Sequence, residues 1–572
     1  MKVLYRMFCA DKRMLVPGMT ISLRMNQPVK KIQNYSTLSG KRNGRIRNAK
    51  GILTGLAIVT IALHSLSLMR YPPPFVDEAW NASRAWAYIQ TGHAFSSLDY
   101  DLCQNYKGYW TFFPLIPTLL ETLFLRWAPE PSLLAVRLEA LLFGFILLAI
   151  ICFSGWKLGG WRLGLVGALY TSLSTPFLSS AHLGCPDIIV AALGFGAILL
   201  SFNQLPRRWW TNLLSGLLIG LAFEIHPNAI IYGPVGVAVY VLIFHLEFWR
   251  KRLFWLFTAG VGIGFAFYVA IHILPFPQTY FALIQLQFVS THTPPLLTFS
   301  LAVFLEGFVS TGRLLFEVYP VELVLFPVTV IYSLIRRSKT DRILLPLVFT
   351  LLVSFALLVR NKLYYYAVLV TPAIDIMVCM LPLAIMDVDQ IPEKLSEGNG
   401  DAPRGSGHQT GRRLWRQIVL AVVVGMMLGS VARSLAPLKT NHVSDLPMVL
   451  DRIRQVVRPE ETIMGTQTYW FGLYNHEFDS WEELVYYQRN NPGATLDDAM
   501  RYYRPDIFII DGHLDRFLLQ SQESSVLLQS LHLQREQFER LLDEYGTLLM
   551  DLYEGQSFGR IRVYRLDWSR GP

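Results

Sequence analysis

The chain has 572 residues, of which 52% are hydrophobic and only 16% charged, and its mean hydropathy is +0.34. These values exclude an ordinary soluble protein and indicate a polytopic membrane protein. The formal net charge of +9 does not indicate nucleic-acid binding, because Lys and Arg are concentrated in short segments between apolar runs. That distribution is typical of membrane topology.

The N-terminal segment, residues 1–50, carries twelve Lys or Arg and a single acidic residue, Asp11. This excess of positive charge predicts a cytoplasmic tail. The apolar run from Gly51 to Met69 has about the ~20 residues that cross a bilayer. We therefore expect a retained first membrane helix, followed by an outside segment at 70–130.

Two adjacent carboxylates, Asp77 and Glu78, follow three prolines at 72–74 near the start of this outside segment. Three prolines cannot continue a helix, so the first span must end there and a new helix can begin near Asp77. Both carboxylates would then lie at a membrane surface. A purely structural role is the alternative, because Asp77 would be a good N-cap and Glu78 a favourable first-turn acid.

Ten further apolar runs give about eleven spans by hydropathy. The short inside connections at 155–162, 205–209, 247–252 and 336–342 are all basic, as the positive-inside rule requires. The inside segment 387–414 is polar and rich in Gly, Ser and Pro, so we expect it to be flexible. The expected spans are 132–155, 161–180, 186–204, 210–225, 228–247, 253–274, 317–335, 342–359, 363–386 and 415–436.

This topology gathers ionisable residues on the outer face. The turn from Ala181 to Asp187 brings His182 and Asp187 to the outer ends of neighbouring spans, and Arg360, Lys362 and Tyr364 to Tyr366 follow at another outer end. Ionisable groups near lipid are costly and persist mainly where they are paired or used. Their accumulation therefore indicates a site.

Structural alternatives apply here too. Asp187 follows a proline and would serve as an N-cap, while the two cations would snorkel and the tyrosines would form an aromatic belt. His64 and His226 are more often buried structural histidines than ligands. Arg137 and Glu139, in the second span, are expected to offset one another.

The five cysteines, at 9, 103, 152, 185 and 379, show no CxxC and no metal-ligand spacing, so a zinc or redox site is not indicated. Cys103 and Cys185 fall on the same side of the membrane. A disulfide between them and a set of unpaired thiols are both open at this stage.

The combined pattern resembles the glycosyltransferases of the GT-C class, and more narrowly the bacterial relatives of protein O-mannosyltransferases and of the lipid A aminoarabinose transferase. The resemblance covers residues 51 to about 390, and the DE pair is its most specific motif. Two departures stand out: Tyr106, Lys107 and Gly108 replace an acid-Lys-Pro motif, and Glu-Ile-His-Pro at 224–227 stands where relatives often have Lys. The matching stretches are VDEAWNASRAWAYIQTG at 76–92, YKGYWTFFPLIPTLLETLF at 106–124, CPDIIVAALGFGAILL at 185–200, GLLIGLAFEIHPN at 216–228 and RNKLYYYAVLVTPAI at 360–374.

The resemblance implies a mainly α-helical GT-C fold at 51–436 and transfer of a sugar, with inversion, from a polyprenyl-phosphate donor to a hydroxyl of a lipid, glycan or protein. The reaction would take place on the extracytoplasmic side of a bacterial plasma membrane. Asp77 would act as general base, with Glu78 positioning the acceptor or supporting Asp77. Lys107, Arg360 and Lys362 would stabilise the leaving phosphate, with Arg360 favoured because arginine can hold phosphate through two parallel hydrogen bonds. The further substrate-binding candidates are His182, Asp187, His226, Tyr364 and Tyr365.

No cofactor is predicted, and a divalent metal at the acidic pair stays open because two neighbouring carboxylates are too few ligands to argue one. The expected partners are the donor lipid, the acceptor and membrane lipids, with no nucleic acid. The outside segment 275–316 is a candidate cover for the donor, with an ordinary interfacial helix as the alternative.

The C-terminal part, residues 437–572, is richer in charge and has no spanning run. Strand-like segments at 461–465, 506–511, 547–552 and 559–566, with helical patterns at 446–457 and 524–546, predict an extracytoplasmic α/β domain. It has no GxGxxG motif, P-loop or serine elbow. Acceptor recognition and simple capping of the membrane domain are the two roles we consider.

Two other function classes stay open. A transporter or lipid flippase would also have many spans, but its coupling residues usually lie near the bilayer midplane and within repeated halves. In this chain the ionisable residues gather at one set of helix ends. An inactive relative that serves as a scaffold is the third class.

Overall fold

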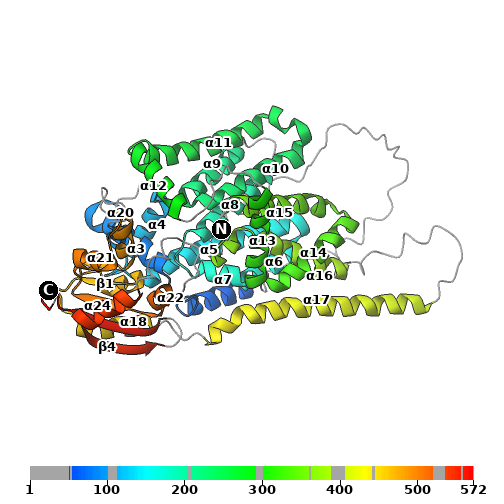
Figure 1. Cartoon of the computed structure of the whole chain (residues 1–572). Coiled ribbons are helices and arrows are strands. Elements are labelled where there is room, and N and C mark those ends of the chain that lie inside the picture. Colours follow the sequence, from blue (N-terminus) through cyan, green and yellow to red (C-terminus); the bar gives the residue numbers. More distant parts are fainter. Residues whose placement is uncertain are drawn as a thin grey trace, which may run out of the picture. The chain divides into compact units, whose positions relative to one another are not determined.

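The computed structural model describes residues 51, 54–100, 113–202, 209–290, 301–359, 362–387, 406–440, 445–519, 535–554 and 558–570. Residues 60–572 form one compact unit, in which long helices precede a small mixed sheet (Figure 1). The chain is therefore a mainly helical membrane protein with a C-terminal α/β domain, as the sequence predicts.

Apolar helices make up the first part. Within the described residues, five segments are long and apolar enough to cross a bilayer, and a sixth is added if α13 and α14, which meet at 116°, count as one bent span. Other predicted spans are shorter apolar helices, and the predicted span 161–180 breaks at Ser174, whose side chain caps α7. The helices are α5 (Leu133–Gly159), α6 (Trp161–Ser172), α7 (Thr175–Ala181), α8 (Asp187–Phe202), α9 (Trp209–Ile225), α10 (Tyr232–Phe244), α11 (Arg252–Tyr268), α13 (Leu301–Val318), α14 (Pro320–Arg336), α15 (Lys339–Leu358), α16 (Thr371–Asp387) and α17 (Ser406–Thr440).

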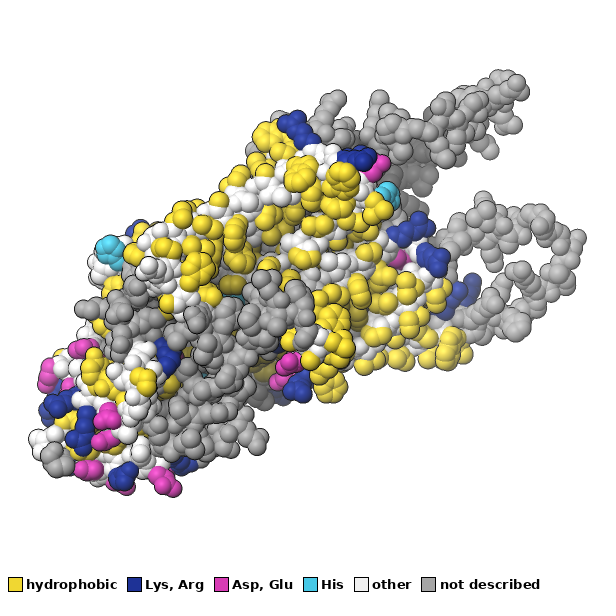
Figure 2. All heavy atoms as spheres, turned by 45° about the horizontal axis from the view of Figure 1, so that its top comes forward, with side chains coloured by type: hydrophobic (Ala, Val, Ile, Leu, Met, Phe, Trp, Pro, Cys, Tyr) yellow, Lys and Arg dark blue, Asp and Glu magenta, His cyan; other side chains and the backbone are white. Residues whose placement is uncertain are grey.

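The outer surface of these helices is apolar. Figure 2 shows hydrophobic side chains covering the helical part, with acidic and basic side chains mixed at the end that carries the sheet. Large exposed side chains on this surface include Ile263, Ile335 and Phe349, each more than half exposed. Such a surface is stable only against lipid or another apolar partner.

Glycines bring α9 and α11 into close contact. Gly216 and Gly220 on α9 face Gly260 and Gly264 on α11, and a Cβ at any of the four would overlap the backbone of the other helix. This paired small-xxx-small arrangement is typical of helices that associate within membranes. Backbone contact here fixes the distance between the two helices.

The segment 70–130 contains the helices α3 (Val76–Thr91) and α4 (Leu115–Leu125). The preceding helix, Thr54–Ser67, ends in a turn at 68–70 before the three prolines at 72–74, and α3 begins directly after the prolines. The N-cap is Phe75, so Asp77 lies in the first turn and does not cap the helix. The predicted outside segment 275–316 is also helical where it is described, with α12 at Pro277–Ser290 followed by α13.

The C-terminal domain is a five-stranded sheet in the order β2-β1-β3-β5-β4. The strands β1, β2 and β3 run parallel. Strand β5 pairs with β3 in the antiparallel direction, and β4 pairs with β5 in the same way. All four predicted strands are present, and β2 was missed because its sequence, Phe-Asp-Ser, has no apolar run. The strands are β1 (Ile463–Gly465), β2 (Phe478–Ser480), β3 (Ile507–Ile510), β4 (Gly546–Glu554) and β5 (Gly559–Leu566), and the main helices are α18 (Leu446–Val456), α19 (Trp470–Leu473), α20 (Glu482–Asn490), α21 (Leu496–Tyr503), α22 (Gly512–Leu519) and α24 (Arg535–Tyr545).

Candidate active site

Glu78 is completely buried and bound by protein groups. Its carboxylate accepts two hydrogen bonds from Arg137, at 2.8 and 2.9 Å, and one each from the backbone N–H of Gly184, at 2.9 Å, and of Phe75, at 2.8 Å. Arg137 also donates to the carbonyl of Leu68 at 3.0 Å. Glu78 therefore fixes the start of α3 against α5 and the turn before α8, and no face of it is left for a substrate.

This ion pair corrects one expectation from the sequence. Arg137 pairs with Glu78 and not with Glu139, two positions further along the same helix. Positions i and i+2 point to different sides of an α-helix, so the two side chains cannot meet.

Asp77 has the opposite surroundings. Asp77 as a residue is half-buried, and the contact that the structure shows for its carboxylate is a long hydrogen bond of 3.4 Å from the Tyr365 hydroxyl. Its recessed position and the negative charge of Glu482 raise its pKa to about 7, although Tyr365 and Arg84 act in the other direction. Asp77 can therefore take up a proton near neutral pH, which a general base requires.

Tyr365 and its neighbours line the recess beside Asp77. Its ring lies 5.8 Å from that of Phe75 and packs with Leu183 and Cys185, and its carbonyl accepts a hydrogen bond of 2.7 Å from Ser180. Tyr364 and Tyr366 contact it edge-on, with ring centres 5.1 and 4.9 Å away. Of the predicted substrate-binding residues, the structure thus brings Tyr365 to Asp77, and Tyr364 contacts Tyr365.

Asp187 opens α8 and is buried, with its Oδ1 atom unpaired. Its charge acts on Tyr365, Tyr366 and Asp77, so it belongs to the same recess. Cys185, two residues before it, is a free thiol, and Cys103 lies outside the described residues. No disulfide joins Cys185 to the described part of the chain.

The histidines have structural partners. His182 is buried between the His64 ring, 2.9 Å away, and the Tyr71 carbonyl, 3.0 Å away, and burial lowers its pKa to about 3. His226 accepts a hydrogen bond of 3.1 Å from the backbone of Asn228 and caps the short helix that follows, although its ring lies 5.5 Å from Tyr366. Neither arrangement requires a ligand.

Of the three predicted phosphate-binding cations, Lys107 and Arg360 lie outside the described residues. Lys362 donates to the carbonyls of Val359, at 2.7 Å, and Ala356, at 3.4 Å, at the C-terminal end of α15. A cation is stabilising at that end of a helix. Phosphate binding by these three residues stays a prediction.

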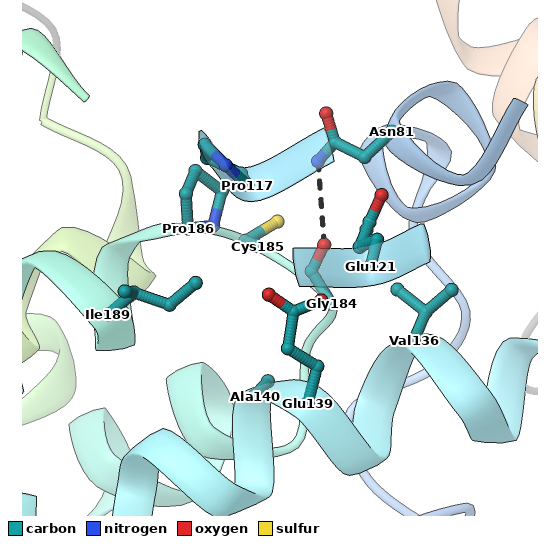
Figure 3. Close-up of a pocket in the computed structure, with 10 residues that line it drawn as sticks. All are labelled: Asn81, Pro117, Glu121, Val136, Glu139, Ala140, Gly184, Cys185, Pro186 and Ile189. Atoms are coloured by element: carbon teal, nitrogen blue, oxygen red, sulfur yellow. Dashed lines mark hydrogen bonds between the residues drawn. The ribbon is translucent and has the colours of Figure 1, made fainter. Parts of the chain in front are cut away.

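A small cavity lies among α3, α4, α5 and the turn before α8 (Figure 3). Asn81 donates to the Gly184 carbonyl at 3.5 Å, and Glu121 from α4 and Glu139 from α5 line the same cavity, each with one unpaired buried oxygen. Burial and the nearby Glu139 raise the pKa of Glu121. Within the described residues, no group of three His, Cys, Asp or Glu could hold a metal ion.

Sequence reasoning missed the role of Glu224. This buried residue, in the Glu-Ile-His-Pro stretch, accepts hydrogen bonds from the backbone N–H groups of Leu115, at 2.5 Å, and Ile116, at 3.2 Å, and its Oε1 atom lies 3.2 Å from Nε2 of His272. It satisfies the free donors at the start of α4. The available signal in the sequence was the position of Glu224 near the end of the predicted span 210–225, just before the proline at 227.

A second buried polar cluster lies among α6, α14, α16 and α17, and it was also missed. Glu322 accepts hydrogen bonds from the hydroxyls of Tyr170 and Ser430, and Asp375 is buried with both carboxyl oxygens unpaired. Buried acids inside a membrane are costly.

The chain has the fold of GT-C membrane glycosyltransferases, with an acidic pair at the first helix after the first span and an α/β domain at the C-terminus. Two solved structures of ArnT from Cupriavidus metallidurans, one bound to undecaprenyl phosphate and one in the apo state, each match with 15% identity and a TM-score of 0.56. They cover 91% and 92% of this chain and 99% and 100% of their own. The apo oligosaccharyltransferase of Archaeoglobus fulgidus matches with 12% identity and a TM-score of 0.51, over 91% of this chain and 74% of its own. No protein-family model matches the chain, and no curated protein matches it in sequence.

Proposed function

We propose that the protein transfers a sugar, with inversion, from a polyprenyl-phosphate-linked donor to an acceptor hydroxyl on the extracytoplasmic side, with Asp77 as the general base. The observation that carries this proposal is the contrast between the two acids. Asp77 is partly exposed and has a pKa near 7, whereas Glu78 is locked by four protein hydrogen bonds. The shared fold with ArnT, one structure of which holds undecaprenyl phosphate, supports the donor class.

In the reaction, Asp77 accepts the proton of the acceptor hydroxyl as its oxygen attacks the anomeric carbon. The bond between that carbon and the phosphate oxygen breaks, and the lipid phosphate leaves with an additional negative charge. A cation at this point stabilises the transition state more than the ground state. Lys107, Arg360 and Lys362 are the proposed cations, and Tyr365 orients the Asp77 carboxylate.

Comparative mass spectrometry tests the proposal. Glycolipids and glycoproteins are compared between cells with the gene, without it, with Asp77→Asn and with Asp497→Asn, an exposed control in α21 that pairs with Arg501. We expect one glycosylated product to disappear in the deletion and to fall about 10²–10⁴-fold with Asp77→Asn, while the control keeps it. An unchanged yield with Asp77→Asn would rule out the base.

An assay in reconstituted vesicles distinguishes the transporter alternative from the proposed glycosyltransferase. Purified protein is reconstituted with the polyprenyl-phosphate sugar and the acceptor that the comparison reveals. Donor-dependent glycosylation supports the proposal, and movement of the donor lipid without product favours a flippase. The structural observation in favour of a flippase is the pair of buried acids Glu322 and Asp375.

A further inference from the structure

A cavity of about 760 Å³ opens on the surface of the helical part between α10 and α15, which pack side by side (Figure 1). Its volume lies in the range of sites that hold small organic ligands, about 300–1,000 Å³. Two polar residues, His245 and Arg342, line it together with four apolar residues, Val241, Leu242, Leu246 and Ile343. The lining therefore suits a ligand that has both a polar and an apolar part.

The cavity lies at the ends of the two helices. Helix α10 ends at Phe244, and His245 begins the short helix 245–250 that follows it. Arg342 lies in the first turn of α15, which begins at Lys339. The topology proposed above places the connections next to these helix ends inside. Figure 2 shows basic side chains grouped at the end of the helical part away from the sheet.

Positive charge exceeds negative charge in the two connections beside the cavity. The acid Asp341 is neutralised by Arg336, which donates to its carboxylate at 2.7 and 2.8 Å. The acid Glu247 lies 3.5 Å from Lys251. In the described part of the chain, the cations of these connections that have no acidic partner are Arg250, Arg252, Arg337 and Arg342. The surroundings of the cavity thus favour an anion.

Arg342 keeps hydrogen-bond donors for a ligand. Its Nε atom donates to the Arg337 carbonyl at 3.2 Å, which holds the guanidinium in place. The terminal nitrogens of this exposed side chain make no hydrogen bond to the residues that the structure describes. Arginine can hold a phosphate through two parallel hydrogen bonds. The positive end of the α15 dipole favours negative charge at the same place, and the His245 ring offers a further N–H donor.

We propose that this cavity binds one anionic phospholipid of the inner leaflet, with its phosphate on Arg342 and His245 and its acyl chains against the apolar lining. Basic pockets between membrane helices at the cytoplasmic side suit anionic head groups. A free phosphate would leave the apolar lining in water, and a zwitterionic head group would bring a second cation beside the arginine. No lining residue belongs to the recess beside Asp77, so the inference does not depend on the transfer reaction.

Native mass spectrometry tests the binding directly. The purified full-length protein in a neutral detergent is titrated with phosphatidylglycerol, and phosphatidylcholine with the same acyl chains is the control lipid. We expect one phosphatidylglycerol to bind more tightly than any further copy, and about 10-fold more tightly than phosphatidylcholine, because it makes charge-assisted hydrogen bonds without bringing a cation. Equal affinities for the two lipids overturn the inference.

Three variants locate the lipid. Arg342→Gln should weaken phosphatidylglycerol binding about 10-fold and leave phosphatidylcholine binding unchanged. Val241→Phe fills part of the cavity without changing its charge and should weaken the binding of both lipids. Arg162→Gln removes an exposed cation of α6 that lies outside the cavity and should change neither. Unchanged binding in Arg342→Gln, or an equal loss in Arg342→Gln and Arg162→Gln, overturns the inference. If Val241→Phe does not fold, the two arginine variants decide the outcome, because both arginines are exposed.

Competition separates the lipid from other phosphate compounds. A large excess of inorganic phosphate should leave phosphatidylglycerol bound, because it cannot use the apolar lining. Displacement by inorganic phosphate would assign the cavity to a free anion and overturn the inference. Tighter binding of undecaprenyl phosphate than of phosphatidylglycerol would assign it to a carrier lipid and would also overturn it.

Discussion

At the scale of residues, two neighbouring acids have opposite roles because consecutive positions on a helix point about 100° apart. Glu78 points into the protein and meets Arg137, while Asp77 points into the recess beside Tyr365. Capping does not compete with the proposed catalytic role of Asp77, because Glu78 accepts the hydrogen bond from the N-cap residue. Glu78 therefore fixes the start of α3, and Asp77 is the acid that remains for the proposed base.

Substitution should separate these roles. Glu78→Gln leaves the fully buried Arg137 without its counter-ion, and we expect a loss of about 3–5 kcal/mol in the free energy of unfolding. Glu78→Gln combined with Arg137→Met should recover part of that loss. Thermal unfolding of the purified protein in detergent measures both, and an unchanged Tm for Glu78→Gln would contradict the structural role.

Asp77→Asn should behave in the opposite way in the same assay. The folded-state pKa of Asp77, about 7, exceeds its ordinary value of 3.8, so between these values the folded state binds more protons than the unfolded state. The ionisation of Asp77 therefore lowers stability as pH rises from about 4 to 7. The Tm of Asp77→Asn should match that of the wild type below pH 4 and be equal or higher at pH 8. A lower Tm at pH 8 would show that the Asp77 carboxylate supports the fold.

The rate of transfer should also follow this group. A base works only when deprotonated, so kcat/KM should rise with pH through about 7 and then level off. A profile that is already flat at pH 5 would mean that Asp77 is not the titrating base.

At the scale of elements, the close contact of α9 and α11 is set by glycines. Gly216 has no room for a methyl group, whereas Gly262, on the lipid-facing side of α11, has nothing within 4 Å of its Cβ position. Gly216→Ala should separate the helices and destabilise the protein by about 1–3 kcal/mol. Gly262→Ala should be neutral or stabilising by up to about 1 kcal/mol. Equal Tm values for the two variants would contradict this packing.

At the scale of the whole molecule, the proposed site is shared by the helical part and the C-terminal domain. Asp77 and Tyr365 come from the helical part, and Glu482, whose charge raises the pKa of Asp77, lies in α20 of the C-terminal domain. The proposal of an extracytoplasmic site therefore requires the C-terminal domain to lie outside and the basic connections inside.

Cysteine labelling in intact cells tests this sidedness. A membrane-impermeant maleimide should label Ser569→Cys, which is exposed at the end of the C-terminal domain, and should label Lys157→Cys only after the membrane is permeabilised. The unaltered chain measures the background from its own cysteines. The reverse pattern would place the domain in the cytoplasm and exclude the proposed topology.

The sequence by itself determined what depends on neighbouring residues. Apolar runs and basic connections identified a membrane protein, three prolines placed the start of α3, and a compact apolar run located β3. These signals are local, because helix ends and strand faces are set by residues a few positions apart. The acidic pair was also visible in the sequence, since its two members are adjacent.

Only the tertiary structure decided which acid was available. Arg137 is 59 residues from Glu78, and Glu482 approaches Asp77 from another domain. Such pairings are chosen by the packing of whole helices, and a sequence with several acids and cations gives no preference among them. Burial then enforces the pairing, because an ionisable group removed from water must either be paired with an opposite charge or stay neutral.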